Sequence, residues 1–150
     1  MNDIIMRLRQ SLATSNRELG TTPESHSAVL YPELSYSIVG AAIEVHRHIG
    51  PGQLESVYQH ALARELAFRA IPFEAQVRIE MDYKGGCVGE FVADFVIDGV
   101  VIVELKAVER VLAVHHAQVL SYLRAMQLRL GMLINFNVAK LTYGVKRVVL

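Results

Sequence analysis

The chain has 150 residues, and its 15 Lys and Arg balance its 15 Asp and Glu. This length predicts one domain with a real core, and the neutral charge argues against a protein that coats nucleic acid non-specifically. The single cysteine, Cys87, excludes an internal disulfide and fits a reducing cytoplasm. Apolar runs long enough for a membrane span or a signal peptide are missing from the sequence, so we expect a cytoplasmic protein.

The first third of the chain predicts an extension followed by two helices. Residues 1–33 are rich in Ser, Thr and Asn, and they suggest a short helix near 3–12 and a linker before a domain over 34–150. Ser35 can cap a helix with an apolar face, and the glycines and proline at 50–52 end it. A second helix is predicted from Leu54 to Arg69, with apolar positions at Leu54, Val57, Ala61, Leu62, Leu66 and Phe68.

From Phe73 the hydrophobic period changes from helical spacing to two, which is typical of strands. Alternation predicts a strand over 73–82, and the Lys84-Gly85-Gly86 turn leads to strands over 90–97 and 100–105. A helix over 113–128 follows, with an apolar stripe through Val114, Ala117, Leu120, Leu123 and Met126. Strands over 132–136 and 143–149 complete the order ααβββαββ, an α/β domain.

Two charged residues end an otherwise apolar strand. Four β-branched residues, 100–103, precede Glu104-Leu105-Lys106, and such a run predicts burial on both faces. Alternation places Glu104 and Lys106 on the same face, where charges need partners because an isolated buried charge is costly. The preceding strand offers Asp94 in an apolar run. A structural salt bridge between Lys106 and Glu104 is the alternative interpretation.

The Asp98-Gly99 turn decides whether Asp94 reaches this face. A two-residue loop would pair Ile97 with Val100 and turn Asp94 away. A three-residue loop with a glycine bulge would pair Val96 with Val100 and place Asp94 opposite Ile102, on the face of Glu104 and Lys106. We predict the three-residue form.

Two carboxylates that share a face repel each other when both are ionised, and a hard divalent cation relieves this repulsion. A lysine beside them can orient a water or stabilise charge on a phosphate. Zinc is disfavoured because Cys87 has no cysteine partner and the histidines lack zinc-site spacing. The sequence also has no phosphate-binding loop and no dinucleotide fingerprint.

Four stretches in register carry a family resemblance: GAAIEVHRHIGPGQLESVY, ADFVIDGVVIVELKA, HHAQVLSYL and GMLINF. They resemble the GxxExxY proteins, which are placed in the PD-(D/E)XK nuclease superfamily, and the resemblance covers about 34–150. It implies a restriction-endonuclease-like fold, a mixed central sheet flanked by helices.

The resemblance also implies roles for individual residues. Asp94, Glu104, the backbone carbonyl of Leu105 and helix-borne Glu55 would hold Mg²⁺ or Mn²⁺, and Lys106 would be the catalytic lysine. Glu55 is equally interpreted as a first-turn glutamate favoured by the helix dipole. Around them, the resemblance or the spacing suggests supporting roles for Gln118 and Tyr122 of a QxxxY element, for Gly52 and Tyr58, which share a face with Glu55, and for His46. Tyr58 is also interpreted as a core residue, and solvent exposure would equally explain the Gln118 and Tyr122 pair.

Three functions remain open at this level. The first is a metal-dependent nuclease acting on DNA or RNA. The second is a non-catalytic nucleic-acid-binding or protein-assembly module on the same fold, which the neutral charge favours. The third is a dimeric regulator that acts with a protein partner; the 52% hydrophobic composition leaves room for a homodimer.

Overall fold

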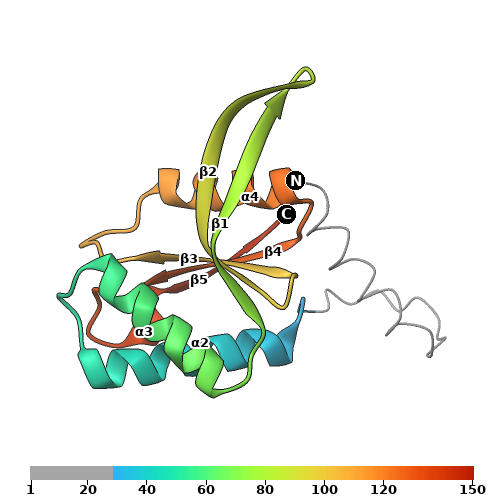
Figure 1. The fold of residues 1–150 in the computed structure, drawn as a ribbon. Helices are drawn as coiled ribbons and strands as arrows, with labels where there is room; N and C mark the ends of the chain where they lie inside the picture. Colours follow the sequence, from blue (N-terminus) through green and yellow to red (C-terminus); the bar gives the residue numbers. More distant parts are fainter. Residues whose placement is uncertain (1–28) are drawn as a thin grey trace, which may run out of the picture.

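A computed structural model describes residues 29–150, so the predicted extension and its helix near 3–12 lie outside the described residues. The described part forms one mixed sheet with helices on both sides (Figure 1), which confirms the predicted α/β class and the order ααβββαββ. The elements are α2 (Pro32–Ile49), α3 (Glu55–Phe68), β1 (Phe73–Tyr83), β2 (Gly86–Ile97), β3 (Val101–Lys106), α4 (Ala113–Met126), β4 (Leu130–Asn135), the 3₁₀ turn η1 (Leu141–Gly144) and β5 (Val145–Val149).

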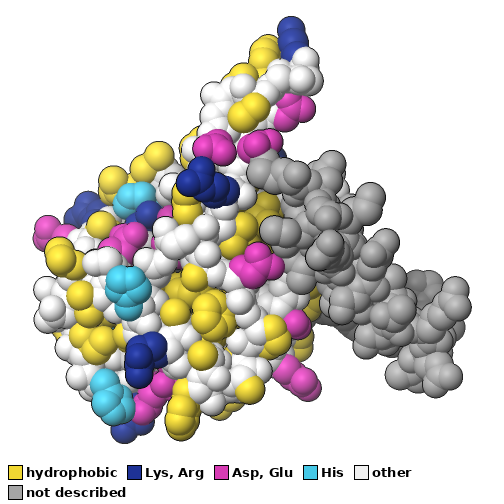
Figure 2. Space-filling view, in the orientation of Figure 1, with side chains coloured by type: hydrophobic (Ala, Val, Ile, Leu, Met, Phe, Trp, Pro, Cys, Tyr) yellow, Lys and Arg dark blue, Asp and Glu magenta, His cyan; other side chains and the backbone are white. Residues whose placement is uncertain are grey.

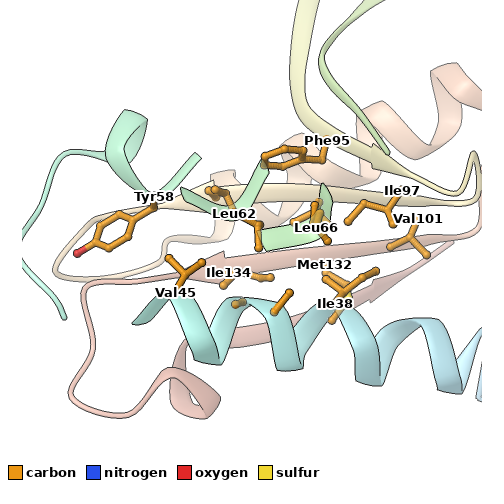
Figure 3. Packing of buried hydrophobic residues seen from close by; sticks show 14 of the residues in the cluster. Ile38, Val45, Tyr58, Leu62, Leu66, Phe95, Ile97, Val101, Met132 and Ile134 are labelled. Carbon is orange, nitrogen blue, oxygen red and sulfur yellow. The ribbon is translucent and has the colours of Figure 1, made fainter. Parts of the chain in front are cut away.

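The strands lie side by side in chain order, β1-β2-β3-β4-β5. Only the β3–β4 pair is parallel, and α4 makes the crossover between these two strands. One apolar cluster joins α2 and α3 to one face of the sheet (Figure 3), and a second joins α4 to the other face. β3 and β4 therefore lie buried between helical layers, as the apolar run of β3 predicts.

Several element boundaries differ from the sequence prediction: β2 begins at Gly86 and not at 90, and β4 spans Leu130–Asn135 and not 132–136. α2 begins at Pro32, so Ser35 is an interior helix residue and caps nothing; its hydroxyl accepts a hydrogen bond from Arg147 at 2.6 Å. Proline is favoured in the first turn of a helix, where its missing N–H is not needed. At the other end, Tyr143 belongs to η1 and the last strand begins at Val145.

The predicted apolar faces of α3 and α4 are partly wrong, for a shared reason. On α3, Leu54 and Phe68 are exposed while Tyr58 is fully buried; on α4, Val114 is exposed while Tyr122 is buried. A tyrosine can occupy a core position when its hydroxyl finds a partner at the rim. Leaving the tyrosines out of the apolar count therefore rotated both predicted faces away from the true ones.

β1 and β2 extend beyond the rest of the sheet as a two-stranded arm (Figure 1). β2 pairs with β1 along almost its whole length, but the pairs with β3 span only 95–97. Hydrophobic and acidic side chains are exposed along this arm (Figure 2). Because β2 leaves β3 near Asp94, the sheet opens beside the charged end of β3.

Candidate active site

The turn between β2 and β3 combines features of both predicted forms. Val100 N–H donates to Ile97 carbonyl at 3.1 Å, and Asp98 and Gly99 both have positive φ, which is typical of a two-residue hairpin turn. Pairing nevertheless resumes with Ile97 opposite Val101, so Val100 is an extra residue. The predicted pairing of Val96 with Val100 is wrong, but the one-residue insertion keeps the predicted parity.

Asp94 and Glu104 consequently face each other across the hairpin. The observed pairs end with Phe95 opposite Val103, and one further step in this register sets Asp94 opposite Glu104. The predicted position of Asp94 opposite Ile102 is wrong by one step along the face, and the true partner is the acidic residue itself. Asp94 N–H lies 3.4 Å from Glu104 Oε2, at the long end of hydrogen-bonding distance.

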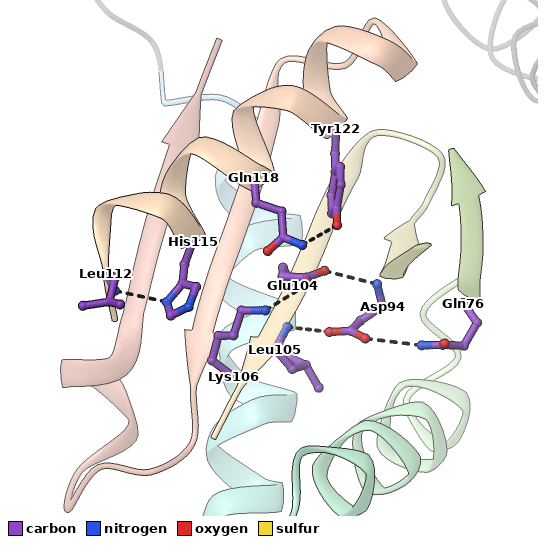
Figure 4. A network of polar contacts seen from close by, with 9 residues as sticks. All are labelled: Gln76, Asp94, Glu104, Leu105, Lys106, Leu112, His115, Gln118 and Tyr122. Atoms are coloured by element: carbon purple, nitrogen blue, oxygen red, sulfur yellow. Dashed lines mark hydrogen bonds and ion pairs between the residues drawn. The ribbon is translucent and has the colours of Figure 1, made fainter. Parts of the chain in front are cut away.

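The side chains of this group are held by short local contacts (Figure 4). Asp94 Oδ2 accepts a hydrogen bond from Leu105 N–H at 2.8 Å, in place of the backbone bond that a continued β2–β3 ladder would make. Lys106 Nζ donates to Glu104 Oε1 at 3.2 Å. The predicted salt bridge therefore exists, and it lies within a larger group that includes Asp94.

The carbonyl of Leu105 points to the same opening. In a strand, the N–H and C=O of one residue project to the same side, and successive residues alternate. Leu105 N–H projects toward Asp94, while the carbonyl of the next residue, Lys106, accepts from Phe136 N–H at 2.8 Å on the β4 side. Leu105 C=O thus projects toward the carboxylates, where the sheet has no strand to accept from.

Burial disfavours the ionised forms of both carboxylates. Burial, with repulsion from Asp94, raises the pKa of Glu104 to about 7, against the attraction of Lys106. Burial also raises the pKa of Asp94, although the Leu105 N–H, Lys106 and Gln76 oppose this change. One lysine is thus too little positive charge for two desolvated carboxylates.

Glu55 stands at the first turn of α3, close enough to feel the same charges. Burial raises the pKa of Glu55, Lys106 opposes the change and Asp94 adds to it. The helix begins at Glu55, so Gly52 lies in the preceding loop and shares no helix face with it; this spacing prediction is wrong. Gly52 instead has φ of 93°, a conformation in which glycine is at no steric disadvantage.

Tyr58 fastens that loop from inside the core. Its hydroxyl donates to Gly50 carbonyl at 2.6 Å and accepts from Gln53 N–H at 3.1 Å, while its ring stacks on Phe136. With no exposed surface, Tyr58 has no means of touching a substrate. It acts on the site by fixing the loop that sets Glu55 at the helix start, and the core interpretation of Tyr58 is the one that fits.

The predicted pair on α4 lies over the carboxylates. Gln118 Nε2 donates to Tyr122 hydroxyl at 2.6 Å, and Figure 4 places both above Glu104. Burial and the charge of Glu104 raise the pKa of Tyr122, against the hydrogen bond from Gln118. Solvent exposure does not explain this pair, because Tyr122 is buried.

His46 lies elsewhere, and a residue that the sequence did not indicate takes part. His46 Nε2 bonds to Val138 carbonyl at 2.8 Å and its ring packs beside Phe136, so it ties α2 to the loop after β4 and does not join the network of Figure 4.

Gln76, opposite Asp94 in the β1–β2 register, donates to Asp94 Oδ1 at 3.3 Å. Only the strand register reveals this contact, so one sequence carries no signal for it.

The donor set fits a hard divalent ion. The carboxylates of Asp94 and Glu104 lie side by side, strand alternation turns the Leu105 carbonyl to the same edge of β3, and a cation would relieve the repulsion between the carboxylates. Within 29–150, three acidic, histidine or cysteine side chains nowhere come close enough to form a ready-made cage. Glu55 would thus have to approach the ion by a side-chain movement.

The fold and this acidic group define a nuclease-like domain. The family model described as the PD-(D/E)XK nuclease superfamily matches residues 32–148, and the chain belongs to this superfamily. No curated protein and no solved structure matches the chain. Among residues 29–150, no helix combines the length and the apolar character that a membrane crossing requires. The narrower assignment to the GxxExxY proteins stays a prediction.

Proposed function

We propose that this protein is a metal-dependent nuclease that hydrolyses phosphodiester bonds in DNA or RNA. The observation that supports this most is the placement of Asp94, Glu104 and Lys106 on one face at the point where β2 leaves β3. A purely structural ion pair needs one acid and one base. A second desolvated carboxylate, opposed to the first, only weakens the apo protein unless something binds there.

Each residue has a distinct task in this proposal. Asp94, Glu104 and the Leu105 carbonyl hold Mg²⁺ or Mn²⁺, and Glu55 completes the ligand set. A bound divalent ion supplies Lewis-acid activation of water and stabilises charge on the phosphate. Lys106, held by Glu104 at 3.2 Å, assists water activation and stabilises negative charge that develops during hydrolysis.

Cleavage of labelled DNA and RNA oligonucleotides by the full chain, with Mn²⁺ and with EDTA, tests the proposal. We expect Mn²⁺-dependent cleavage that Glu104→Gln and Lys106→Ala abolish. The matched controls are Glu109→Gln and Lys84→Ala, which change the same side-chain types at exposed positions. The proposed nuclease activity would be refuted if cleavage survived both site substitutions, or if calorimetry found no Mn²⁺ binding.

Binding without cleavage would instead support the non-catalytic module. In that case the oligonucleotides would shift in fluorescence anisotropy, and Mn²⁺ would leave them intact. The neutral net charge of the chain is compatible with such a binding module. The module would bind weakly, and its affinity would fall steeply with salt, because contacts to phosphates alone would provide the binding energy.

A further inference from the structure

His115 is a histidine whose ring is fixed in one orientation at the start of α4. Its Nδ1 accepts a hydrogen bond from Leu112 N–H at 3.1 Å. A nitrogen that accepts from an amide carries no proton, so the ring proton sits on Nε2. Within the described part of the chain Nε2 has no hydrogen-bond partner, which leaves a donor at the far edge of the ring.

The helix places His115 on the face that also carries the two residues over the site described above. His115, Gln118 and Tyr122 are spaced i, i+3 and i+7, so they lie along one face of α4. Gln118 and Tyr122 lie over the carboxylates. Figure 4 shows the His115 ring on the same side of β3, one turn nearer the helix start. His116, the next residue, is exposed on another side of the helix.

The antiparallel run of α4 against β3 sets the level of the ring. α4 crosses between two parallel strands, so it runs back along β3. Seven helix residues from Tyr122 to His115 span about 10 Å, and two strand residues from Glu104 to Lys106 span about 7 Å. Because Tyr122 is close to Glu104, His115 lies near the Lys106 end of the site.

An anionic ligand at this end needs hydrogen-bond donors besides Lys106. Lys106 Nζ is already engaged by Glu104, so a phosphate that approaches the site meets few free donors. A neutral Nε2–H can donate to a phosphate oxygen without adding charge beside the carboxylates. A donor that is held by its own hydrogen bond gives up little side-chain freedom on binding.

We propose that His115 is a substrate-contacting residue whose Nε2–H donates to a phosphate oxygen of the nucleic acid strand, beside the Lys106 end of the site. This inference rests on the proposed nuclease function and extends it by one residue. The contact anchors the strand next to the phosphate that is hydrolysed. The histidine does not hold the metal ion, so metal affinity is independent of it.

Two substitutions separate the halves of the ring. The Asn side chain reproduces the position of Nδ1, so His115→Asn keeps an acceptor for Leu112 N–H and removes the distal donor. The longer Gln side chain reproduces the position of Nε2, so His115→Gln keeps the distal donor and removes the acceptor. His116→Asn is the matched control on the exposed neighbour.

The test measures Mn²⁺-dependent cleavage of the labelled oligonucleotides, Mn²⁺ affinity by calorimetry and the melting temperature of each full-chain variant. We expect kcat/KM of His115→Asn to fall about 10- to 100-fold, as for loss of a hydrogen bond to a charged group. His115→Gln should keep more activity than His115→Asn and melt at a lower temperature. Mn²⁺ affinity should be unchanged in both.

Several outcomes overturn the inference. If His115→Asn cleaves as well as His116→Asn, the distal nitrogen touches no substrate. If His115→Gln loses more activity than His115→Asn, the ring serves only to hold the helix start. These two results leave the proposed nuclease intact. If the wild-type protein itself cleaves no oligonucleotide, the nuclease proposal fails and this inference fails with it.

Discussion

Replacing Glu104 by glutamine removes one of two opposed carboxylates and keeps the size of the side chain. The amide oxygen can still accept the hydrogen bond that Lys106 Nζ donates to Glu104 Oε1. The substitution therefore isolates the charge. We expect it to stabilise the metal-free protein at neutral and alkaline pH and to abolish its response to Mn²⁺.

The magnitude follows from the pKa of Glu104, which burial and Asp94 raise from 4.5 to about 7 in the folded protein. Below pH 4.5 the group is protonated in both folded and unfolded chains and its stabilising contribution is fully present. As the pH rises to about 7, the unfolded chain ionises first, so this contribution is lost. A tenfold change in proton affinity is worth about 1.4 kcal/mol, so the loss approaches about 3 kcal/mol.

Thermal unfolding with EDTA between pH 4.5 and 8 measures this effect. For a chain of this size, 3 kcal/mol corresponds to about 10 °C in melting temperature. We expect the wild type to lose that margin relative to Glu104→Gln as the pH rises, and Glu109→Gln to follow the wild type. Saturating Mn²⁺ should restore the wild type and leave Glu104→Gln unchanged, because a ligand that binds only the folded state stabilises it.

If the melting temperatures of the wild type and Glu104→Gln change in parallel with pH, the reasoning is refuted. The ionised Glu104 carboxylate would then not destabilise the folded protein. An equal rise in melting temperature with Mn²⁺ in both proteins would refute the ligand assignment for Glu104. Neither result would contradict the fold described above, because both concern the charge of Glu104 and not the hydrophobic core.

Three further substitutions test other parts of the site. Lys106→Met should lower cleavage at least about 100-fold without weakening Mn²⁺ binding in calorimetry; weaker binding would make the lysine a structural residue. Glu55→Gln should weaken Mn²⁺ affinity about tenfold or more and leave the melting temperature nearly unchanged, and unaltered affinity would remove Glu55 from the ligand set. Tyr58→Phe should lower stability by about 1–2 kcal/mol, because the loop before α3 loses its partners. The exposed Tyr36→Phe is its control in chemical denaturation.

The sequence by itself determined the order of elements and the charged residues of the site. The change from helical to strand periodicity at Phe73 is a local property, and it located the sheet. The apolar run before Glu104 showed that the charges there had to be answered by partners. Alternation alone placed Glu104 and Lys106 on one face, and their ion pair confirms it.

Only the tertiary structure decided what surrounds those residues. The extra residue Val100 sets Asp94 opposite Glu104, and a difference of one residue in a turn changes which side chains share a face. Gln76 reaches Asp94 because two strands pair in one register. Tyr58 is buried with its hydroxyl bonded to Gly50 and Gln53 in the preceding loop, and Tyr122 with its hydroxyl bonded to Gln118 one helix turn earlier. A count of hydrophobic periodicity includes neither hydrogen bond, so it left both tyrosines out of the core. The contacts of Asp94 with Glu104 and with Gln76 join separate strands, and a single sequence does not give the distance between two strands.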